Sequence, residues 1–195
     1  MHRGRRVPRS VGYRGRDDGP PGVDRAVALT DADRQIGNLI GAYSELIDRG
    51  DFDGLADLLA DAGVGEVPRG GDPDRAPQVL RGRDRLRALY ESTTRRYADG
   101  TPLTKHLTTN LIVDIDEALG RATSRSSWLV LQAAPGLPLQ PILAGRYHDR
   151  FECRDGRWRF TERLYQVDLV GDVSHHLLEH RAPTPSRDDA TPDRA

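Results

Sequence analysis

Residues 145–160, GRYHDRFECRDGRWRF, carry the clearest β-strand pattern of the sequence. Polar residues alternate with apolar or aromatic ones on both sides of Asp155-Gly156, and a period of two is typical of β-strands. An Asp-Gly pair between two such runs is a strong signal for a tight hairpin turn. We therefore predict two antiparallel strands, near 141–154 and 157–169, that are joined at this turn.

The sequence upstream of this hairpin divides into a helical half and a strand half. Strands are predicted near 104–116 and 120–134, with a loop between Pro135 and Pro141 before the hairpin. Apolar residues recur at helical spacing in three earlier segments, which begin after Thr30, after Asp51 and near residue 82. The third helix is predicted over about 82–98, and residues 63–77 are predicted to be mostly loop, with one short strand around 64–67. Helices followed by an antiparallel meander predict an α+β fold, with the helices packed on one face of a curved sheet.

Length and composition limit the classes of protein that the chain can belong to. The 195 residues fit one domain with tails, and a net charge of −1 gives no global attraction to nucleic acid or to an anionic membrane. A single cysteine, Cys153, excludes a disulfide within the chain and a cysteine zinc cluster. Neither a run of about 18 apolar residues nor the apolar core of a signal peptide is present, so we expect a cytoplasmic protein.

Both ends of the chain lack a core pattern. Residues 1–28 are rich in arginine and glycine, and we expect a disordered basic leader there. Residues 181–195 consist largely of charged residues and proline, and we expect a disordered tail. The predicted folded domain spans residues 29–180. His175, His176 and His180 lie near its end without a carboxylate pattern for a metal, so we interpret them as a solvated helix end.

Two residues are candidates for proton transfer. Asp48 lies near the end of the first predicted helix, and His106 lies near the start of the first long strand. A helix end and a strand start can meet in one pocket, where a carboxylate and an imidazole form a proton-transfer pair. A plainer interpretation stays open for each residue: a polar helix end for Asp48, and a strand histidine bonded to backbone for His106.

The first predicted helix carries a line of small residues. On a helical wheel, Asp48 lies away from the apolar stripe and in line with Gly37, Gly41 and Ser44. Each glycine in a helix costs about 1 kcal/mol relative to alanine. The line therefore indicates that something approaches the helix backbone closely, either a ligand in a cavity or another element packed tightly. Tyr43 belongs to the apolar stripe, which predicts a core position.

Several motifs in this order resemble the SnoaL-like branch of the NTF2-like superfamily. They are YSELIDRGDFDGL at 43–55, TKH at 104–106 with Asn110 after it, the hairpin quoted above, and DLVGD at 168–172. The resemblance covers roughly residues 29–180 and implies a cone, in which a strongly curved, mostly antiparallel sheet wraps around the N-terminal helices. Members include scytalone dehydratase, bile-acid dehydratases, polyketide cyclases, ketosteroid isomerases and non-catalytic dioxygenase subunits.

The resemblance also implies roles for individual residues. Asp48 and His106 match the catalytic carboxylate and histidine of the dehydratases. Tyr43 matches a tyrosine that some members place in the pocket, against the prediction from the wheel. Asn110 and Tyr147 lie at strand positions that often line the cavity. In one departure from the dehydratases, which carry a further His or Asp on the next strand, the chain is apolar near Leu129 and Val130.

These observations lead to one functional hypothesis and one alternative. We predict a cofactor-free acid–base enzyme, a dehydratase, isomerase or cyclase, that acts on an apolar molecule bearing hydroxyl or carbonyl groups, such as a polyketide or a steroid-like compound. Asp48 would orient His106 and stabilise its protonated form, and no metal ligand is predicted. The predicted substrate-binding residues are Tyr43, Asn110, Trp128, Tyr147 and Phe160. The alternative is a non-catalytic NTF2-like protein that binds a ligand or a subunit.

The predicted partners follow from the same hypothesis. We expect a small apolar substrate and a homo-oligomer, a dimer or trimer, formed through the outer sheet face. Neither a membrane nor a nucleic acid is an expected partner.

Overall fold

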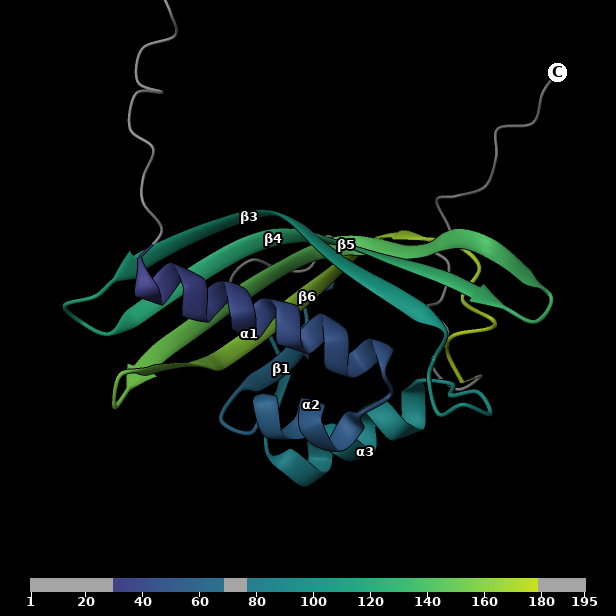
Figure 1. Cartoon of the computed structure of the whole chain (residues 1–195), viewed down its shortest axis with the longest axis horizontal. Helices are drawn as coiled ribbons and strands as arrows, with labels where there is room; N and C mark the ends of the chain where they lie inside the picture. Colours follow the sequence, from purple (N-terminus) through teal and green to yellow (C-terminus); the bar gives the residue numbers. More distant parts are fainter. Residues whose placement is uncertain (1–29, 69–76, 179–195) are drawn as a thin grey trace, which may run out of the picture.

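The computed structural model describes residues 30–68 and 77–178 (Figure 1). The helices are α1 (Asp31–Asp48), α2 (Phe52–Leu58) and α3 (Arg83–Thr93). The strands are β1 (Gly63–Glu66), β2 (Val79–Leu80), β3 (Thr104–Asp116), β4 (Arg121–Ala134), β5 (Leu137–Arg154) and β6 (Arg157–Val170). The predicted disordered leader and tail, residues 1–28 and 181–195, lie outside the described part of the chain.

The six strands form one sheet in the order β2-β1-β6-β5-β4-β3. Neighbouring strands run antiparallel except β1 and β6, which are parallel. The four long strands bend together, and the helices lie on one side of the sheet (Figure 1). This arrangement confirms the predicted α+β class and the predicted helices on one face of a curved sheet.

Helix α1 begins and ends at the residues that the sequence indicates. Thr30 and Asp33 form a capping box at the N-terminus, as the Thr-x-x-acid pattern favours. At the C-terminus, the amide of Gly50 donates to the carbonyl of Ile47, and the amide of Asp51 donates to the carbonyl of Leu46. This pair of bonds is the Schellman motif, and Gly50 adopts the left-handed φ of 68° that the motif requires. The end of α1, with Asp48 on its last turn, is therefore fixed by local sequence.

The close approach predicted for the glycine line of α1 is wrong. A Cβ built on Gly37 or Gly41 would have no atom within 4 Å, so both positions border open space. The buried side of the helix is the apolar stripe, which includes Tyr43. Neither a ligand cavity nor a packed element explains the two glycines.

Two further boundaries differ from the predictions. Helix α3 ends at Thr93 rather than near 98, because Thr94 turns to an extended conformation and forms a bridge with Leu177. Strand β5 begins at Leu137, within the segment predicted to be a loop. Its first residues pair with β4, whereas pairing with β6 begins only at Leu143. The prolines in this part of β5 are tolerated because only β4 pairs with it, so the edge of the strand that faces away from β4 needs no amide donor.

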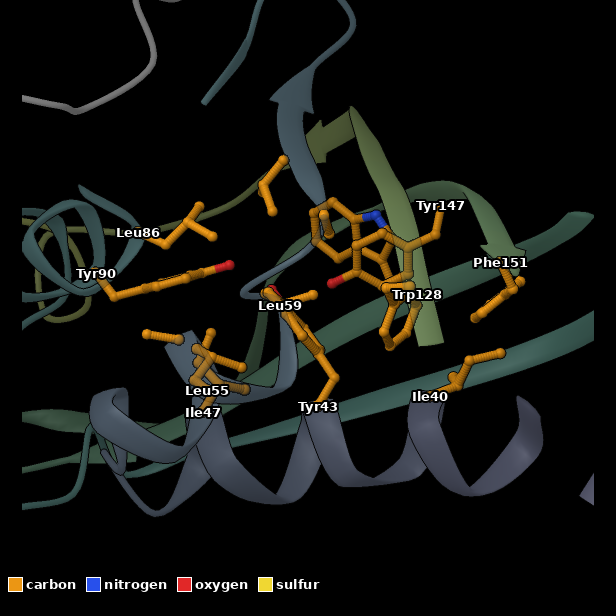
Figure 2. Close-up of a cluster of buried hydrophobic side chains, with 14 of the residues drawn as sticks. Ile40, Tyr43, Ile47, Leu55, Leu59, Leu86, Tyr90, Trp128, Tyr147 and Phe151 are labelled. Carbon is orange, nitrogen blue, oxygen red and sulfur yellow. The ribbon is translucent and has the colours of Figure 1, made fainter. Parts of the chain in front are cut away.

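The hydrophobic core fills the space between the helices and the inner face of the sheet (Figure 2). Phe151 and Phe160, one from each strand of the hairpin, pack with ring centroids 4.8 Å apart. Among the described helices, none combines the length and the apolar character that crossing a lipid bilayer requires.

Candidate active site

Inward-facing rows of the sheet make one wall of a cavity. Strand register places His106 opposite Val130 and Val130 opposite Leu143, and all three side chains line the cavity. Side chains directly opposite one another on neighbouring strands share a face of the sheet. The strand register alone therefore places these three side chains in one row across the inner face. The next rows contribute Trp128, Val167, Tyr147 and Tyr165.

The opposite wall comes from the helices and from the segment after β6. Helix α1 contributes Tyr43 and Ile47, α3 contributes Leu89 and Tyr90, and the last segment contributes His176. The cavity has a volume of about 260 Å³. Its wall also includes Glu66, which is exposed and marks a side on which the cavity meets solvent. The lining is therefore mostly apolar, with few polar groups, as small-molecule sites commonly are.

The structure brings Asp48 and His106 together. The Nδ1 atom of His106 lies 2.7 Å from Oδ1 of Asp48, and the backbone amide of His106 donates to the same carboxylate. The hydroxyl of Thr104 adds a third bond, of 2.9 Å. Because Nδ1 faces a carboxylate, the proton of the neutral ring is assigned to Nδ1, and Nε2 is left as the basic nitrogen.

Burial strengthens this pair. The side chains of Asp48 and His106 are only 7% and 8% exposed. Burial tends to raise the pKa of Asp48, but the bonds from His106 and Thr104 outweigh it and hold the pKa below its ordinary value. Asp48 is therefore a carboxylate at neutral pH. It lies behind the imidazole ring, and only His106 of the two lines the cavity.

Three tyrosines of the cavity wall, Tyr43, Tyr90 and Tyr147, point their hydroxyl groups toward one another (Figure 2). Tyr43 interacts with Tyr90 and Tyr147 through these groups. Burial is the main cause that raises the pKa of Tyr43 and of Tyr147 well above the ordinary value, and it raises that of Tyr90 to about 12. All three hydroxyls therefore stay protonated and can donate hydrogen bonds.

A buried ion pair supports two of these rings. The guanidinium of Arg163 lies 3.9 Å from the ring centroid of Tyr43 and 3.8 Å from that of Tyr147. Its Nη1 lies 3.3 Å from Oδ2 of Asp149, and both side chains are essentially inaccessible. Asp149 is thus a buried carboxylate whose partner is Arg163. Burial raises the pKa of Asp149 to about 6, and the charge of Arg163 opposes that rise.

The sequence-predicted binding residues divide into two groups. Tyr43, Trp128 and Tyr147 line the cavity, so Tyr43 is both a core residue and a cavity residue. Asn110 is exposed, at the bulge of β3 with a φ of 52°, and it does not line the cavity. Phe160 is buried but packs on Phe151, away from the cavity lining. The resemblance implied a cavity position for Asn110, and the bulge of β3 changes the register there.

The sequence did not identify His176 as a cavity residue. His176 is 5% exposed and lines the cavity, so its interpretation as part of a solvated helix end is wrong. The segment after β6 makes only a single turn before it bridges to Thr94, and that turn carries the ring inward. Among residues 30–68 and 77–178, His, Cys, Asp and Glu side chains form no group of three or more that could hold a metal ion.

Comparison with solved structures defines the class of protein first. An NTF2-like protein with a cystatin-like fold from Novosphingobium aromaticivorans has a TM-score of 0.52 and 21% identity, over 73% of this chain and 84% of that chain. The fold is therefore the NTF2-like cone that the sequence predicts. The sequence model of the SnoaL-like domain matches residues 28–164, and the chain belongs to the SnoaL-like family.

Individual relatives in this class differ in what is known of them. Rv3472 from Mycobacterium tuberculosis, a protein of unknown function solved as a variant, is 27% identical over 70% of this chain and 72% of that chain, with a TM-score of 0.54. A proposed scytalone dehydratase from Novosphingobium aromaticivorans is 25% identical over 71% of this chain and 85% of that chain, with a TM-score of 0.52. None of the curated proteins matches the chain significantly.

Proposed function

We propose that this protein is a cofactor-free acid–base enzyme that removes a proton from a carbon next to a carbonyl group. The observation that carries the proposal is the 2.7 Å contact between Asp48 and His106 at the wall of a mostly apolar cavity. The contact fixes the ring, assigns its proton to Nδ1 and leaves Nε2 free to act as the base.

The proposed reaction begins with proton transfer from carbon to Nε2 of His106. The imidazolium that forms lies against the carboxylate of Asp48, which stabilises its charge. The electrons of the broken C–H bond move toward the carbonyl oxygen, and the hydroxyl of Tyr147 donates a hydrogen bond to that oxygen. The imidazolium then returns the proton to a leaving hydroxyl in a dehydration, or to another carbon in an isomerisation or cyclisation.

The size of the cavity limits the proposed substrate. A volume of about 260 Å³ lies just below the range of about 300–1,000 Å³ typical of drug-sized ligands. We therefore propose a substrate with one or two rings, smaller than a steroid. Its carbonyl group would face the tyrosine hydroxyls, and its apolar body would contact Trp128 and Val130. The similarity to a proposed scytalone dehydratase supports a dehydratase among the possible reactions.

The proposal is tested by proton exchange on small ketones, because exchange does not require the natural substrate. Wild-type protein is incubated in D₂O with 1-tetralone, 2-tetralone or 4-chromanone, and loss of the α-proton signal is followed by ¹H NMR. We expect His106→Ala to slow catalysed exchange by about 10²–10⁴-fold, the usual contribution of a general base. His148→Ala removes an exposed histidine of β5 and serves as the matched control. Equal exchange by wild type and His106→Ala would exclude His106 as the base, and tight ketone binding without exchange would favour the non-catalytic alternative.

We also propose that the protein forms a homo-oligomer through the outer face of the sheet. Strand register aligns Leu107 with Leu129, Leu129 with Ala144, and Ala144 with Leu169. These four apolar side chains cross four strands on the face opposite the helices, and Leu107 and Leu169 are 40% and 68% exposed. A second copy that covers this row would remove it from water.

A further inference from the structure

His176 is held in place by backbone contacts on both sides. Its amide donates to the carbonyl of Val173, and its carbonyl accepts from the amide of Arg95, just beyond α3. The next residue, Leu177, forms the bridge with Thr94. The ring therefore enters the cavity from a segment whose backbone is fixed by α3, not from a free chain end.

The ring of His176 lies close to that of His106. Their centroids are 6.5 Å apart, with the planes inclined at 60°, and both rings line the cavity. A ring nitrogen reaches a partner atom at about 3 Å. One bound molecule can therefore contact both imidazoles through neighbouring atoms.

The surroundings of His176 indicate which nitrogen carries its proton. Nδ1 is buried and has no hydrogen-bond partner among the described residues. An orphaned buried N–H donor is rarer than an unpaired acceptor, so the proton belongs on Nε2. With Nδ1 enclosed, the Nε2 edge is the one that can meet a ligand in the cavity.

The charge state of His176 follows from its surroundings. Burial, and next the charge of His106, lower the pKa of His176 to about 4, while Asp48 acts in the opposite direction. The ring is therefore neutral at pH 7 and donates as an imidazole. The other titratable groups of the cavity wall are Glu66, Tyr43, Tyr90, Tyr147 and Tyr165.

We propose that His176 is a second catalytic residue, a neutral imidazole whose Nε2–H donates a hydrogen bond to the carbonyl oxygen of the substrate while His106 takes the α-proton. This inference rests on the proposed function and adds a donor to that of Tyr147. Protons balance in the step: the C–H bond breaks, its electron pair forms the enolate, and the proton stays on Nε2 of His106. His176 only donates a hydrogen bond to the enolate oxygen.

A neutral donor suits this position better than a charged one. When His106 becomes an imidazolium, a second imidazolium with its centroid 6.5 Å away would oppose the proton transfer. The neutral ring avoids this repulsion and still stabilises the developing negative charge, the principle by which neutral histidines act as electrophiles in other enzymes.

The proposal is tested with three variants in the ketone exchange assay. His176→Leu removes the donor, His176→Gln keeps an N–H of similar reach, and His175→Gln is the control on the neighbouring residue, which does not line the cavity. We expect His176→Leu to slow exchange by about 10²–10³-fold, the usual loss for one oxyanion-hole donor. We expect His176→Gln to stay within about tenfold of wild type, and His175→Gln to match it.

A second measurement does not depend on the folding of any variant. In ¹⁵N NMR of the wild type, we expect His176 to be the neutral Nε2–H tautomer from pH 5 to pH 9, and its Nε2 signal to move when 4-nitrophenol, an enolate mimic, is added. A charged ring at pH 7, an Nδ1–H tautomer, or full exchange activity in His176→Leu would overturn the inference. If His176→Leu is fully active and His106→Ala is not, only this inference fails; if both are fully active, the proposed function fails too.

Discussion

At the scale of single residues, Asp48 connects the last turn of α1 to the first residues of β3. Its carboxylate accepts from the hydroxyl of Thr104 and from both the backbone and the ring of His106. A neutral side chain cannot satisfy all of these donors equally well. The charge of Asp48 therefore positions His106 and also contributes to the stability of the fold.

Asp48 gives a prediction for stability as a function of pH. Because its pKa is lowered in the folded state, its contribution is present above the ordinary aspartate pKa and is lost as pH falls through the lowered value. We expect Asp48→Asn to reduce the free energy of unfolding by about 1.5–3 kcal/mol at pH 7, and by less at pH 3, which lies below the ordinary aspartate pKa. Urea unfolding at the two pH values measures this difference. A loss of unfolding free energy that is the same at both pH values would contradict the lowered pKa of Asp48 in the folded state.

Residues that titrate or carry charge were only partly predictable at this scale. Asp48 and His106 were found because a helix end and a strand start are recognisable positions. His176 was missed because one turn after a strand has no periodicity that shows which side faces inward. Arg163 was missed because an arginine on a strand is usually solvated, and only the packed rings of Tyr43 and Tyr147 show that it is buried.

At the scale of elements, the C-terminus of α1 controls the position of Asp48. Gly50 closes the helix with a left-handed φ, and a Cβ at this residue would overlap the carbonyl oxygen of Gly100. Gly37 and Gly41 lie in the same helix but border open space. A substitution at Gly50 therefore alters the end of α1, whereas a substitution at Gly37 or Gly41 alters its middle and leaves the end unchanged.

The glycines of α1 and its C-cap give a matched pair of predictions. Gly50→Ala should lower the free energy of unfolding by at least about 1–2 kcal/mol, the cost of a left-handed conformation with a Cβ, and should slow ketone exchange because Asp48 shifts. Gly37→Ala should raise the free energy of unfolding by about 0.5–1 kcal/mol and leave exchange unchanged. Chemical denaturation with the exchange assay tests both. A stabilised Gly50→Ala would show that this helix end tolerates another geometry.

Element boundaries were predictable where the signal was local. The start of α1 after Thr30 and the Asp155-Gly156 turn are set by adjacent residues, and the structure has both where they were predicted. The end of α3 and the start of β5 depend on contacts with Leu177 and with β4, which are far away in sequence. Tertiary pairing overrides local pattern at such positions.

At the scale of the whole molecule, one sheet serves two surfaces. Its inner face makes one wall of the cavity, which includes Trp128. Gly145 leaves room for the Trp128 side chain, because a Cβ at this position would overlap Trp128 and the carbonyl oxygen of Gln166. Its outer face carries the apolar row that includes Leu107 and Leu169. Because neighbouring residues of a strand face opposite sides, register fixes both surfaces together.

The outer row gives a prediction for the oligomeric state. We expect the wild type to be a dimer or trimer in light scattering, and Leu107→Glu with Leu169→Glu to lower its mass, because two charges per copy would be buried in the interface. Leu119→Glu changes a residue that is 68% exposed in the β3–β4 turn and serves as the control. An unchanged mass in the double variant would place the interface elsewhere.

Rescue by free imidazole tests the claim that the imidazole of His106 acts as a base inside the cavity. Removal of the ring by His106→Ala leaves space beside Asp48, which keeps its bond to Thr104. We predict that adding imidazole to this variant restores exchange of ketone α-protons in D₂O, with a rate that rises and then saturates with imidazole concentration. A variant that exchanges as fast as wild type without imidazole, or that imidazole accelerates no more than it accelerates the reaction in buffer, would contradict the claim.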